Sequence, residues 1–299
     1  MTFGICDEGF RAVATHRLVS AYAVSRKAGS PHGQLWEGRA VCQDFLGTSG
    51  GSVGACEPHR LTDPSRSEGT VMNEPFHSPA LLFDLDGTLI DSVYQHVLAW
   101  HEALQSMGLL LAVWRIHRRI GMSGGLLAQA LGREIGQRVT HQQAEELQKR
   151  HAAAFLKYQN EIQPLPGAAE LLATLREAGI PWAIATSGRR EAAAPALEKL
   201  GVGSGDPVIT RQEVRRAKPD PDLFLAAAER LQVPVSRAMV VGDSVWDLLA
   251  ARRAGCLGVG ILSGGYGREE LQQVGAYRVY QDPADMLVHL DEIGIRRDE

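Results

Sequence analysis

A short apolar run within residues 80–89 ends in two acidic residues. Residues 80–83 are all apolar, which is typical of a parallel strand with helices on both faces of its sheet. Asp84 and Asp86 follow, and Gly87 ends the strand in a turn. Ligands of open α/β sheets bind beyond the carboxyl ends of the strands, so both carboxylates are expected in a functional pocket. An acidic turn is the alternative interpretation, because Asp-Gly is a common turn pair.

Beyond this first strand, strand and helix patterns alternate along most of the chain. Apolar runs predict strands at 182–186, 208–210, 238–241, 257–262 and 277–280. Apolar periodicity and glycine stops predict helices at 167–178, 191–200, 221–231 and 244–254. Asp220 is expected to be the N-cap of the third of these helices and Pro221 its first residue. The alternation implies an α/β fold, with a Rossmann-like, mostly parallel sheet and helices on both faces.

One helical block, at 91–164, interrupts this alternation. Apolar residues recur at three- and four-residue steps over 93–107, which predicts an amphipathic helix. Thr140 has the pattern of a capping box that opens a second helix, which runs toward residue 158. The sequence therefore predicts a small helical domain inserted into an α/β core made of 72–90 and 165–299.

The first 71 residues differ from the rest of the chain. They contain glycine-rich pieces, scattered prolines and no sustained apolar period, so residues 1–71 are expected to be a disordered or non-native extension. Translation that begins at Met72 is a further hypothesis. A weakly basic amphipathic stretch at 11–27 leaves an organelle-targeting segment as the alternative.

Composition argues against several broad classes of function. The net charge of −4 gives no support for a nucleic-acid surface. The four cysteines have no C-x-x-C spacing, so neither a disulfide framework nor a zinc site is expected, and a reducing cytoplasm suits the chain. No uninterrupted apolar run approaches the ~18 residues that span a bilayer, so no membrane partner is expected.

The string D-x-D-G-T-L at 84–89 resembles the first motif of the haloacid dehalogenase-like hydrolase superfamily. The resemblance implies that Asp84 is a nucleophile that attacks phosphorus and forms an aspartyl-phosphate. It implies that Asp86 is the acid/base that protonates the leaving group and then activates water. Thr88 is expected to orient the loop. The dehalogenase branch lacks the second aspartate, so Asp86 favours phosphate chemistry over dehalogenation.

Two later segments resemble the second and third motifs, in family order. Thr186 ends a predicted strand, and the resemblance implies that its hydroxyl binds a phosphate oxygen. Ser187 and Gly188 are expected to add backbone donors to that oxygen. Lys218, in the string A-K-P-D-P, is implied to offset the negative charge of the nucleophile and the phosphate.

The segment 240–247 resembles the fourth motif, in which an apolar strand again ends in an acidic residue. The resemblance implies that Asp243 binds Mg²⁺, together with the side chain of Asp84 and the backbone carbonyl of Asp86. Asp247 has two interpretations. It either caps the helix that Ser244 opens or supports the metal site.

The insert resembles the helical cap of the phosphoglycolate phosphatase and β-phosphoglucomutase-like subgroup, which closes over the substrate. His96 is expected either to face the substrate or to be a polar residue at the cap hinge. Mutase relatives carry an arginine just after the serine of the cap substrate loop, where this chain has Gly124. Arg118 and Arg119 lie close enough in the sequence to compensate in part.

The function implied by the resemblance is that of a Mg²⁺-dependent phosphatase, which hydrolyses a phosphomonoester of the phosphoglycolate or sugar-phosphate class. The expected partner is a small phosphorylated metabolite, and the expected assembly is a monomer or homodimer. A hexose-phosphate mutase is one alternative, and a catalytically idle binding or regulatory module on the same fold is another. The complete set of motif residues argues against the idle module. Phosphonate cleavage is disfavoured because no lysine occurs at 91–108 to form a Schiff base.

Overall fold

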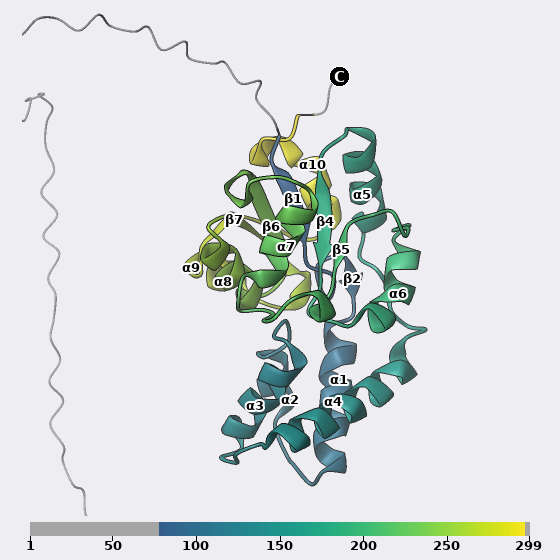
Figure 1. The fold of residues 1–299 in the computed structure, drawn as a ribbon, viewed down its shortest axis with the longest axis vertical. Helices are drawn as coiled ribbons and strands as arrows, with labels where there is room; N and C mark the ends of the chain where they lie inside the picture. Colours follow the sequence, from purple (N-terminus) through teal and green to yellow (C-terminus); the bar gives the residue numbers. More distant parts are fainter. Residues whose placement is uncertain (1–77, 297–299) are drawn as a thin grey trace, which may run out of the picture. The chain divides into compact units, whose positions relative to one another are not determined.

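The structure is a computed structural model that describes residues 78–296, so the predictions for residues 1–71 lie outside the described residues. A six-stranded sheet forms the core, with every pairing parallel and the order β5-β4-β1-β6-β7-β8 (Figure 1). The strands are β1 (Ala80–Phe83), β4 (Trp182–Ala185), β5 (Val208–Ile209), β6 (Ala238–Gly242), β7 (Leu257–Ile261) and β8 (Ala276–Tyr280). The predicted α/β fold with a mostly parallel sheet is confirmed.

Helices cover both faces of the sheet (Figure 1). They are α5 (Ala168–Glu177), α6 (Arg190–Lys199), α7 (Asp222–Arg230), α8 (Val245–Ala254), α9 (Arg268–Gln273) and α10 (Pro283–Val288). In β1, Leu81 and Phe83 pack with α5, α6 and α10, whereas Ala80 and Leu82 pack with α7 and α8. Successive side chains of a strand point to opposite faces, which explains why this strand had to be apolar throughout.

A helical cap is inserted after β1. An antiparallel ribbon of β2 (Ile90–Asp91) and β3 (Gln163–Pro164) connects it to the core. The cap helices are α1 (Val93–Ser106), α2 (Val113–His117), α3 (Gly124–Glu134) and α4 (His141–Phe155), followed by a 3-10 turn at Leu156–Tyr158. They enclose an apolar core of their own, which includes Val97, Leu104, Ile116, Leu131 and Leu147.

The predicted capping box at the start of α4 is confirmed. The backbone N–H of Gln143 donates to Oγ1 of Thr140 at 3.2 Å, and the N–H of Thr140 donates to the Gln143 side chain at 2.9 Å. This reciprocal pair satisfies two N–H groups that a helix start leaves without partners.

The predicted start of α7 is wrong by one residue. Pro221, not Asp220, is the N-cap, and its carbonyl accepts hydrogen bonds from Phe224 and Leu225. Asp220 belongs to the preceding turn, in which its N–H donates to the carbonyl of Ala217 at 3.2 Å. The turn that carries Lys218 therefore extends through Asp220, and the helix begins one residue later than predicted.

No helix within 78–296 is both long and apolar enough to cross a membrane.

Candidate active site

Polar side chains gather where the three neighbouring strands β4, β1 and β6 end. Thr186 follows β4, Asp84 follows β1 and Asp243 follows β6. The carboxyl ends of parallel strands meet at one edge of a sheet, where ligands of such folds bind. Asp84 and Asp243 are each only 3% exposed and Thr186 has no exposed surface. The strand order therefore brings together residues that are far apart in the sequence.

Lys218 is fully buried between two carboxylates. Its Nζ forms ion pairs with Oδ1 of Asp84 and, at 2.8 Å, with Oδ1 of Asp247. Burial alone would lower the pKa of this lysine, but Asp247 and Asp84 raise it above its ordinary value. Burial, with help from Asp247 and Asp86, raises the pKa of Asp84 to about 7, although Lys218 opposes the rise. A permanent positive charge is thus fixed beside the Asp84 carboxylate.

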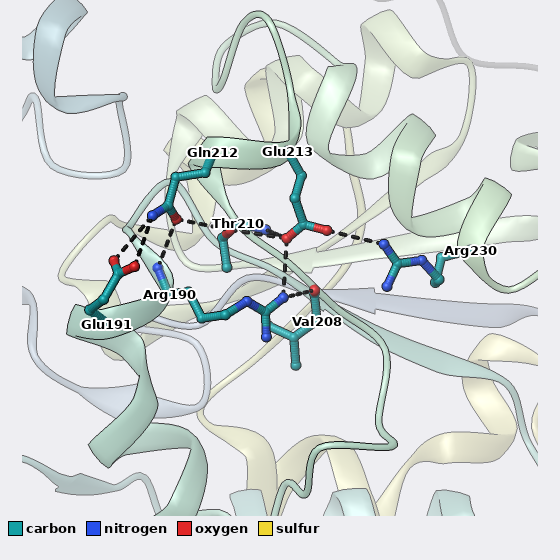
Figure 2. Close-up of polar contacts among 7 residues, drawn as sticks. All are labelled: Arg190, Glu191, Val208, Thr210, Gln212, Glu213 and Arg230. Atoms are coloured by element: carbon teal, nitrogen blue, oxygen red, sulfur yellow. Dashed lines mark hydrogen bonds and ion pairs between the residues drawn. The ribbon is translucent and has the colours of Figure 1, made fainter.

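A polar network holds the loop that leads from β5 to this lysine (Figure 2). Glu213 accepts hydrogen bonds from the N–H of Thr210 at 3.0 Å, from Arg190 at 3.1 Å and from Arg230 at 3.0 Å. Arg190 comes from α6 and Arg230 from α7, and Gln212 adds hydrogen bonds to Glu191 at the start of α6. The loop is therefore tied to a helix on each face of the sheet.

Asp247 fulfils the cap role and also contacts the lysine. Its Oδ2 accepts hydrogen bonds from the N–H and the hydroxyl of Ser244, at 3.1 and 2.5 Å, which completes a capping box at the start of α8. Its Oδ1 faces Lys218. A Cβ on Gly242 would lie 2.3 Å from Cβ of Asp247, so the close approach of α8 to β6 requires glycine there.

Three buried carboxylates form a cluster that suits a divalent cation. Oxygens of Asp84, Asp243 and Asp247 lie within 4.8 Å of one another. When ionised they carry three negative charges against the single positive charge of Lys218. Burial, Asp247 and Asp84 raise the pKa of Asp243 well above its ordinary value, because this excess charge is poorly balanced. Oxygen ligands are those that Mg²⁺ prefers, so the donor set fits this ion.

Glycines keep the space beside Asp243 open. A Cβ on Gly264 would lie 1.8 Å from Oδ2 of Asp243, and a Cβ on Gly87 would lie 2.7 Å from the same atom. Thr88 donates a hydrogen bond to Oδ1 of Asp243 at 3.1 Å. The threonine therefore orients this carboxylate directly, which is a more specific contact than the loop role expected from the sequence.

Asp86 lies in a different environment from the buried cluster. Its side chain is 28% exposed and its Oδ1 accepts a hydrogen bond from Oγ of Ser92 at 2.6 Å. Nε2 of His96 lies 3.3 Å from the same oxygen. Burial alone would raise the pKa of Asp86, but His96 and Ser92 lower it to about 2. His96 therefore contacts the second aspartate of the motif, from the first helix of the cap.

The residues after β4 are brought to the same edge. Oγ1 of Thr186 accepts a hydrogen bond from the N–H of Gly188 at 2.9 Å. The hydroxyl of Ser187 donates to the carbonyl of Gly121 in the cap at 3.4 Å. Ser187 and Gly188 line a cavity between the core and the cap, whereas Thr186 is buried.

A cavity of about 920 Å³ lies between the core and the cap. Its core wall includes Asp84, Asp86 and Lys218, and its cap wall includes Ser123 and Gln148. The N–H of Ser123 donates to the carbonyl of Lys218 at 3.3 Å, so the cap contacts the core beside the lysine. The cavity therefore lies between Asp84 of the acidic cluster and a wall that the insert supplies.

Three residues of the site were missed from the sequence. Nothing in the sequence singled out Ser92 as a partner of Asp86, or Gly264 as a neighbour of Asp243. His151 lies on the same stripe of α4 as the buried residues Ala144, Leu147 and Phe155, at steps of three and four. A polar residue on a buried stripe was the signal that could have found it.

Comparisons with known proteins agree with this site. A family model described as haloacid dehalogenase-like hydrolase matches residues 79–255, more than half of the chain. The crystal structure of a hydrolase from Pseudomonas syringae is 52% identical with a TM-score of 0.71, and covers 73% of this chain and 100% of that chain. Hexitol phosphatase A of Escherichia coli is 33% identical over 183 residues, 58% of this chain and 79% of that protein. A phosphoglycolate phosphatase of Neisseria meningitidis is 32% identical over 195 residues, 63% of this chain and 82% of that protein. The chain belongs to the haloacid dehalogenase-like hydrolase family.

Proposed function

We propose that the chain is a Mg²⁺-dependent phosphatase that hydrolyses a small phosphorylated metabolite through an aspartyl-phosphate on Asp84. The observation that carries the proposal is the buried pairing of Asp84 with Lys218, with Asp86 on the wall of the same cavity. A nucleophile, a fixed cation and an acid/base thus line the same cavity. The relatives from Escherichia coli and Neisseria meningitidis are both phosphatases, which supports the same reaction.

The proposed reaction has two halves. In the first, a carboxylate oxygen of Asp84 bonds to phosphorus while the bond from phosphorus to the leaving oxygen breaks, and Asp86 gives that oxygen a proton. In the second, the oxygen of a water molecule bonds to phosphorus while the bond from phosphorus to Asp84 breaks, Asp86 takes a proton from that water, and inorganic phosphate leaves. Lys218 offsets the negative charge that gathers between Asp84 and the phosphoryl oxygens in both halves.

The protonation of Asp86 changes between these halves. A pKa of about 2 makes it a carboxylate in the free enzyme, which is the form that activates water. The first half needs its protonated form. The approach of a phosphate dianion favours that form, because a nearby like charge raises the pKa of a carboxyl group.

Asp84 and Asp243 would hold Mg²⁺, with the backbone carbonyl of Asp86 as the further ligand implied by the resemblance. An ion held there would supply positive charge to offset that of the phosphoryl group, and would favour the ionised form of Asp84. Thr88 orients Asp243 through its hydrogen bond, and Asp247 helps to hold Lys218 in place.

The substrate that the cavity suits best is a sugar or polyol phosphate. Its volume of about 920 Å³ is at the upper end of ordinary ligand pockets, which is ample for a leaving group larger than glycolate. Ser123 and Gln148 of the cap wall offer a hydroxyl and an amide, groups that pair with sugar hydroxyls. The backbone N–H of Ser187 would receive the phosphate.

The mutase alternative finds no support in the cap. The side chain that packs against Gly124 is the neutral amide of Gln148, whose Oε1 would lie 3.1 Å from a Cβ at that glycine. Arg118 pairs with Glu270 and Arg119 pairs with Glu134, so both guanidinium groups are engaged elsewhere. Neither of these two arginines therefore replaces the cation that mutase relatives carry after the serine of the cap loop.

The experiment is phosphate release from a panel of sugar, polyol and two-carbon phosphomonoesters, with Mg²⁺ and with EDTA. We expect release that requires Mg²⁺ and is abolished by Asp84→Asn, with the highest kcat/KM on sugar or polyol phosphates. Asp291→Asn, at an exposed position far along the chain, is the matched control and should behave as the wild type. Release that survives EDTA or Asp84→Asn would contradict the mechanism, and a wild type inactive on the whole panel would contradict the function.

A further inference from the structure

The 3-10 turn Leu262–Gly264, which follows β7, contacts the loops that carry the acidic cluster. The hydroxyl of Ser263 donates a hydrogen bond to the carbonyl of Gly87, in the loop after β1, at 2.6 Å. Gly264 is buried against Asp243, which follows β6, and a Cβ at this glycine would lie 1.8 Å from Oδ2 of that carboxylate. The turn therefore bridges the loop after β1 and the carboxylate of Asp243.

The same segment also contacts the cap. Nε2 of His117, in α2, lies 2.8 Å from the carbonyl oxygen of Gly264. A carbonyl oxygen only accepts hydrogen bonds, so the imidazole donates from Nε2. At the next residue, Gly265, a Cβ would lie 2.7 Å from the hydroxyl oxygen of Tyr94 and 3.0 Å from Nε2 of His117. Two consecutive glycines thus connect Asp243 with side chains of the cap.

Aromatic neighbours hold the ring of His117 in place. It stacks on Tyr94 of α1, with ring centroids 5.4 Å apart and an interplanar angle of 6°. The ring of Tyr266, from the core, lies 5.8 Å away at an angle of 31°. A ring that packs against two aromatic side chains keeps its nitrogen aimed at one acceptor, so less conformational freedom is lost when the hydrogen bond forms.

The position of the turn affects how Asp243 is held. Groups that support a metal ligand contribute to metal affinity, because they keep the ligand in the orientation that the ion requires. Gly264 is such a group, since its backbone lies directly against the carboxylate. The hydrogen bond from His117 favours this position of the turn only when α2 is docked on the core. The docked cap and the orientation of Asp243 therefore depend on one shared contact.

We propose that His117 is a positioning residue of the metal site, which couples cap docking to Mg²⁺ binding by holding the turn Leu262–Gly264 against Asp243. The proposal rests on the proposed function, in which Asp243 binds Mg²⁺. Coupling between two sites is reciprocal, so the ion favours the docked cap by the same factor by which the docked cap favours the ion. A single hydrogen bond corresponds to a factor of about two to ten.

The first test is Tm over a Mg²⁺ titration, which gives an apparent Kd without turnover. His117→Phe keeps an aromatic ring beside Tyr94 and removes the donor, so we expect the apparent Kd for Mg²⁺ to rise about two- to tenfold. His117→Gln places an amide N–H near the position of Nε2 and should recover most of the lost affinity. A purely structural role of His117 would lower Tm equally at every Mg²⁺ concentration and leave the apparent Kd unchanged.

Two control variants show which site the titration reports. Asp243→Asn should lose the Mg²⁺-dependent rise in Tm. His289→Phe removes a histidine that makes a similar contact at the end of α10, where Nδ1 lies 2.9 Å from the carbonyl oxygen of Asp285. This variant should keep the apparent Kd of the wild type. An unchanged Kd in His117→Phe, or no recovery in His117→Gln, would overturn the proposal.

Hydrogen exchange tests the reciprocal half of the coupling. In the wild type, saturating Mg²⁺ should slow amide exchange in α2 and leave α10 unchanged, and His117→Phe should lose most of this effect. Equal exchange of α2 with and without Mg²⁺ in the wild type would reject the coupling. A wild-type Tm that does not respond to Mg²⁺ would contradict both the proposed metal site and this inference, whereas an equal response of wild type and His117→Phe would contradict the inference alone.

Discussion

Lys218 is important both for the fold and for the proposed chemistry. A lysine with no exposed surface loses its hydration, and only close opposite charges can offset that loss. Asp84 and Asp247 supply them. The same two contacts fix the ammonium beside the proposed nucleophile, so the residue cannot be removed without leaving two carboxylates buried and unbalanced.

Replacing Lys218 by Met keeps most of the side-chain volume and removes the charge. We expect the free energy of unfolding to fall by about 3–5 kcal/mol, since breaking a buried ion pair leaves uncompensated charge behind. Urea unfolding followed by circular dichroism measures this change. Lys157→Met is the control, because Lys157 pairs with Glu102 at the surface and should cost less than about 1 kcal/mol. If the free energy of unfolding falls equally in the two variants, the buried ion pair contributes no more to stability than the surface pair.

The sequence predicted individual site residues better than their partnerships. Asp84, Lys218 and Asp243 stand in recognisable strings, so local pattern alone is enough to name each of them. The pairing of Lys218 with Asp247 and the hydrogen bond from Thr88 to Asp243 could not be predicted, because they join separate strands and loops. Contacts of this kind depend on strand order and on how far each loop turns, which no local pattern encodes.

At the scale of elements, predictability followed the strength of the local pattern. The apolar strand β1 and the long amphipathic helix α1 were identified because burial imposes a regular period on them. The short helix α2 spans only Val113–His117 and buries a single residue, Ile116, so its period is too brief to detect. The ribbon of β2 and β3 is two residues long on each side and likewise leaves no pattern.

The 3-10 turn Leu262–Gly264 is an element whose fit against the acidic cluster can be tested. A Cβ on Gly264 would overlap the carboxylate of Asp243, so Gly264→Ala must displace either the turn or the carboxylate. We expect apparent Mg²⁺ affinity to weaken by about tenfold or more, as for other changes that disturb the support of a metal ligand. Thermal unfolding over a Mg²⁺ titration measures this, because an ion that binds the folded state raises Tm.

The control for this turn is Gly205→Ala. Nothing lies within 4 Å of a Cβ at that position, and its φ is outside the left-handed region. Its Mg²⁺-dependent rise in Tm should equal that of the wild type. If Gly264→Ala also keeps the full rise, Asp243 either tolerates the added methyl or does not bind the ion.

At the scale of the whole described part, the cap contacts the core at a second place away from the cavity. The carbonyl of Arg118 accepts hydrogen bonds from Nε1 of Trp246 at 3.3 Å and from the hydroxyl of Tyr266 at 3.1 Å. The guanidinium of Arg118 lies 4.3 Å over the Tyr266 ring and pairs with Glu270. Nε2 of His117 lies 2.8 Å from the carbonyl of Gly264, the last residue of the 3-10 turn beside Asp243. These contacts hold the end of α2 against the core.

Tyr266→Phe removes one of these hydrogen bonds and keeps the ring under Arg118. A hydrogen bond contributes about 0.5–1.5 kcal/mol, so the closed arrangement should become about two- to tenfold less favoured. Because closure excludes water and completes the site in such enzymes, kcat/KM should fall by a similar factor. Hydrogen exchange should quicken in α2 but not in β1, whose strand lies within the core. Tyr277→Phe, at a half-exposed position of β8, is the control. Unchanged exchange in α2 of Tyr266→Phe would mean that closure rests on the contacts at Ser123 and Lys218 instead.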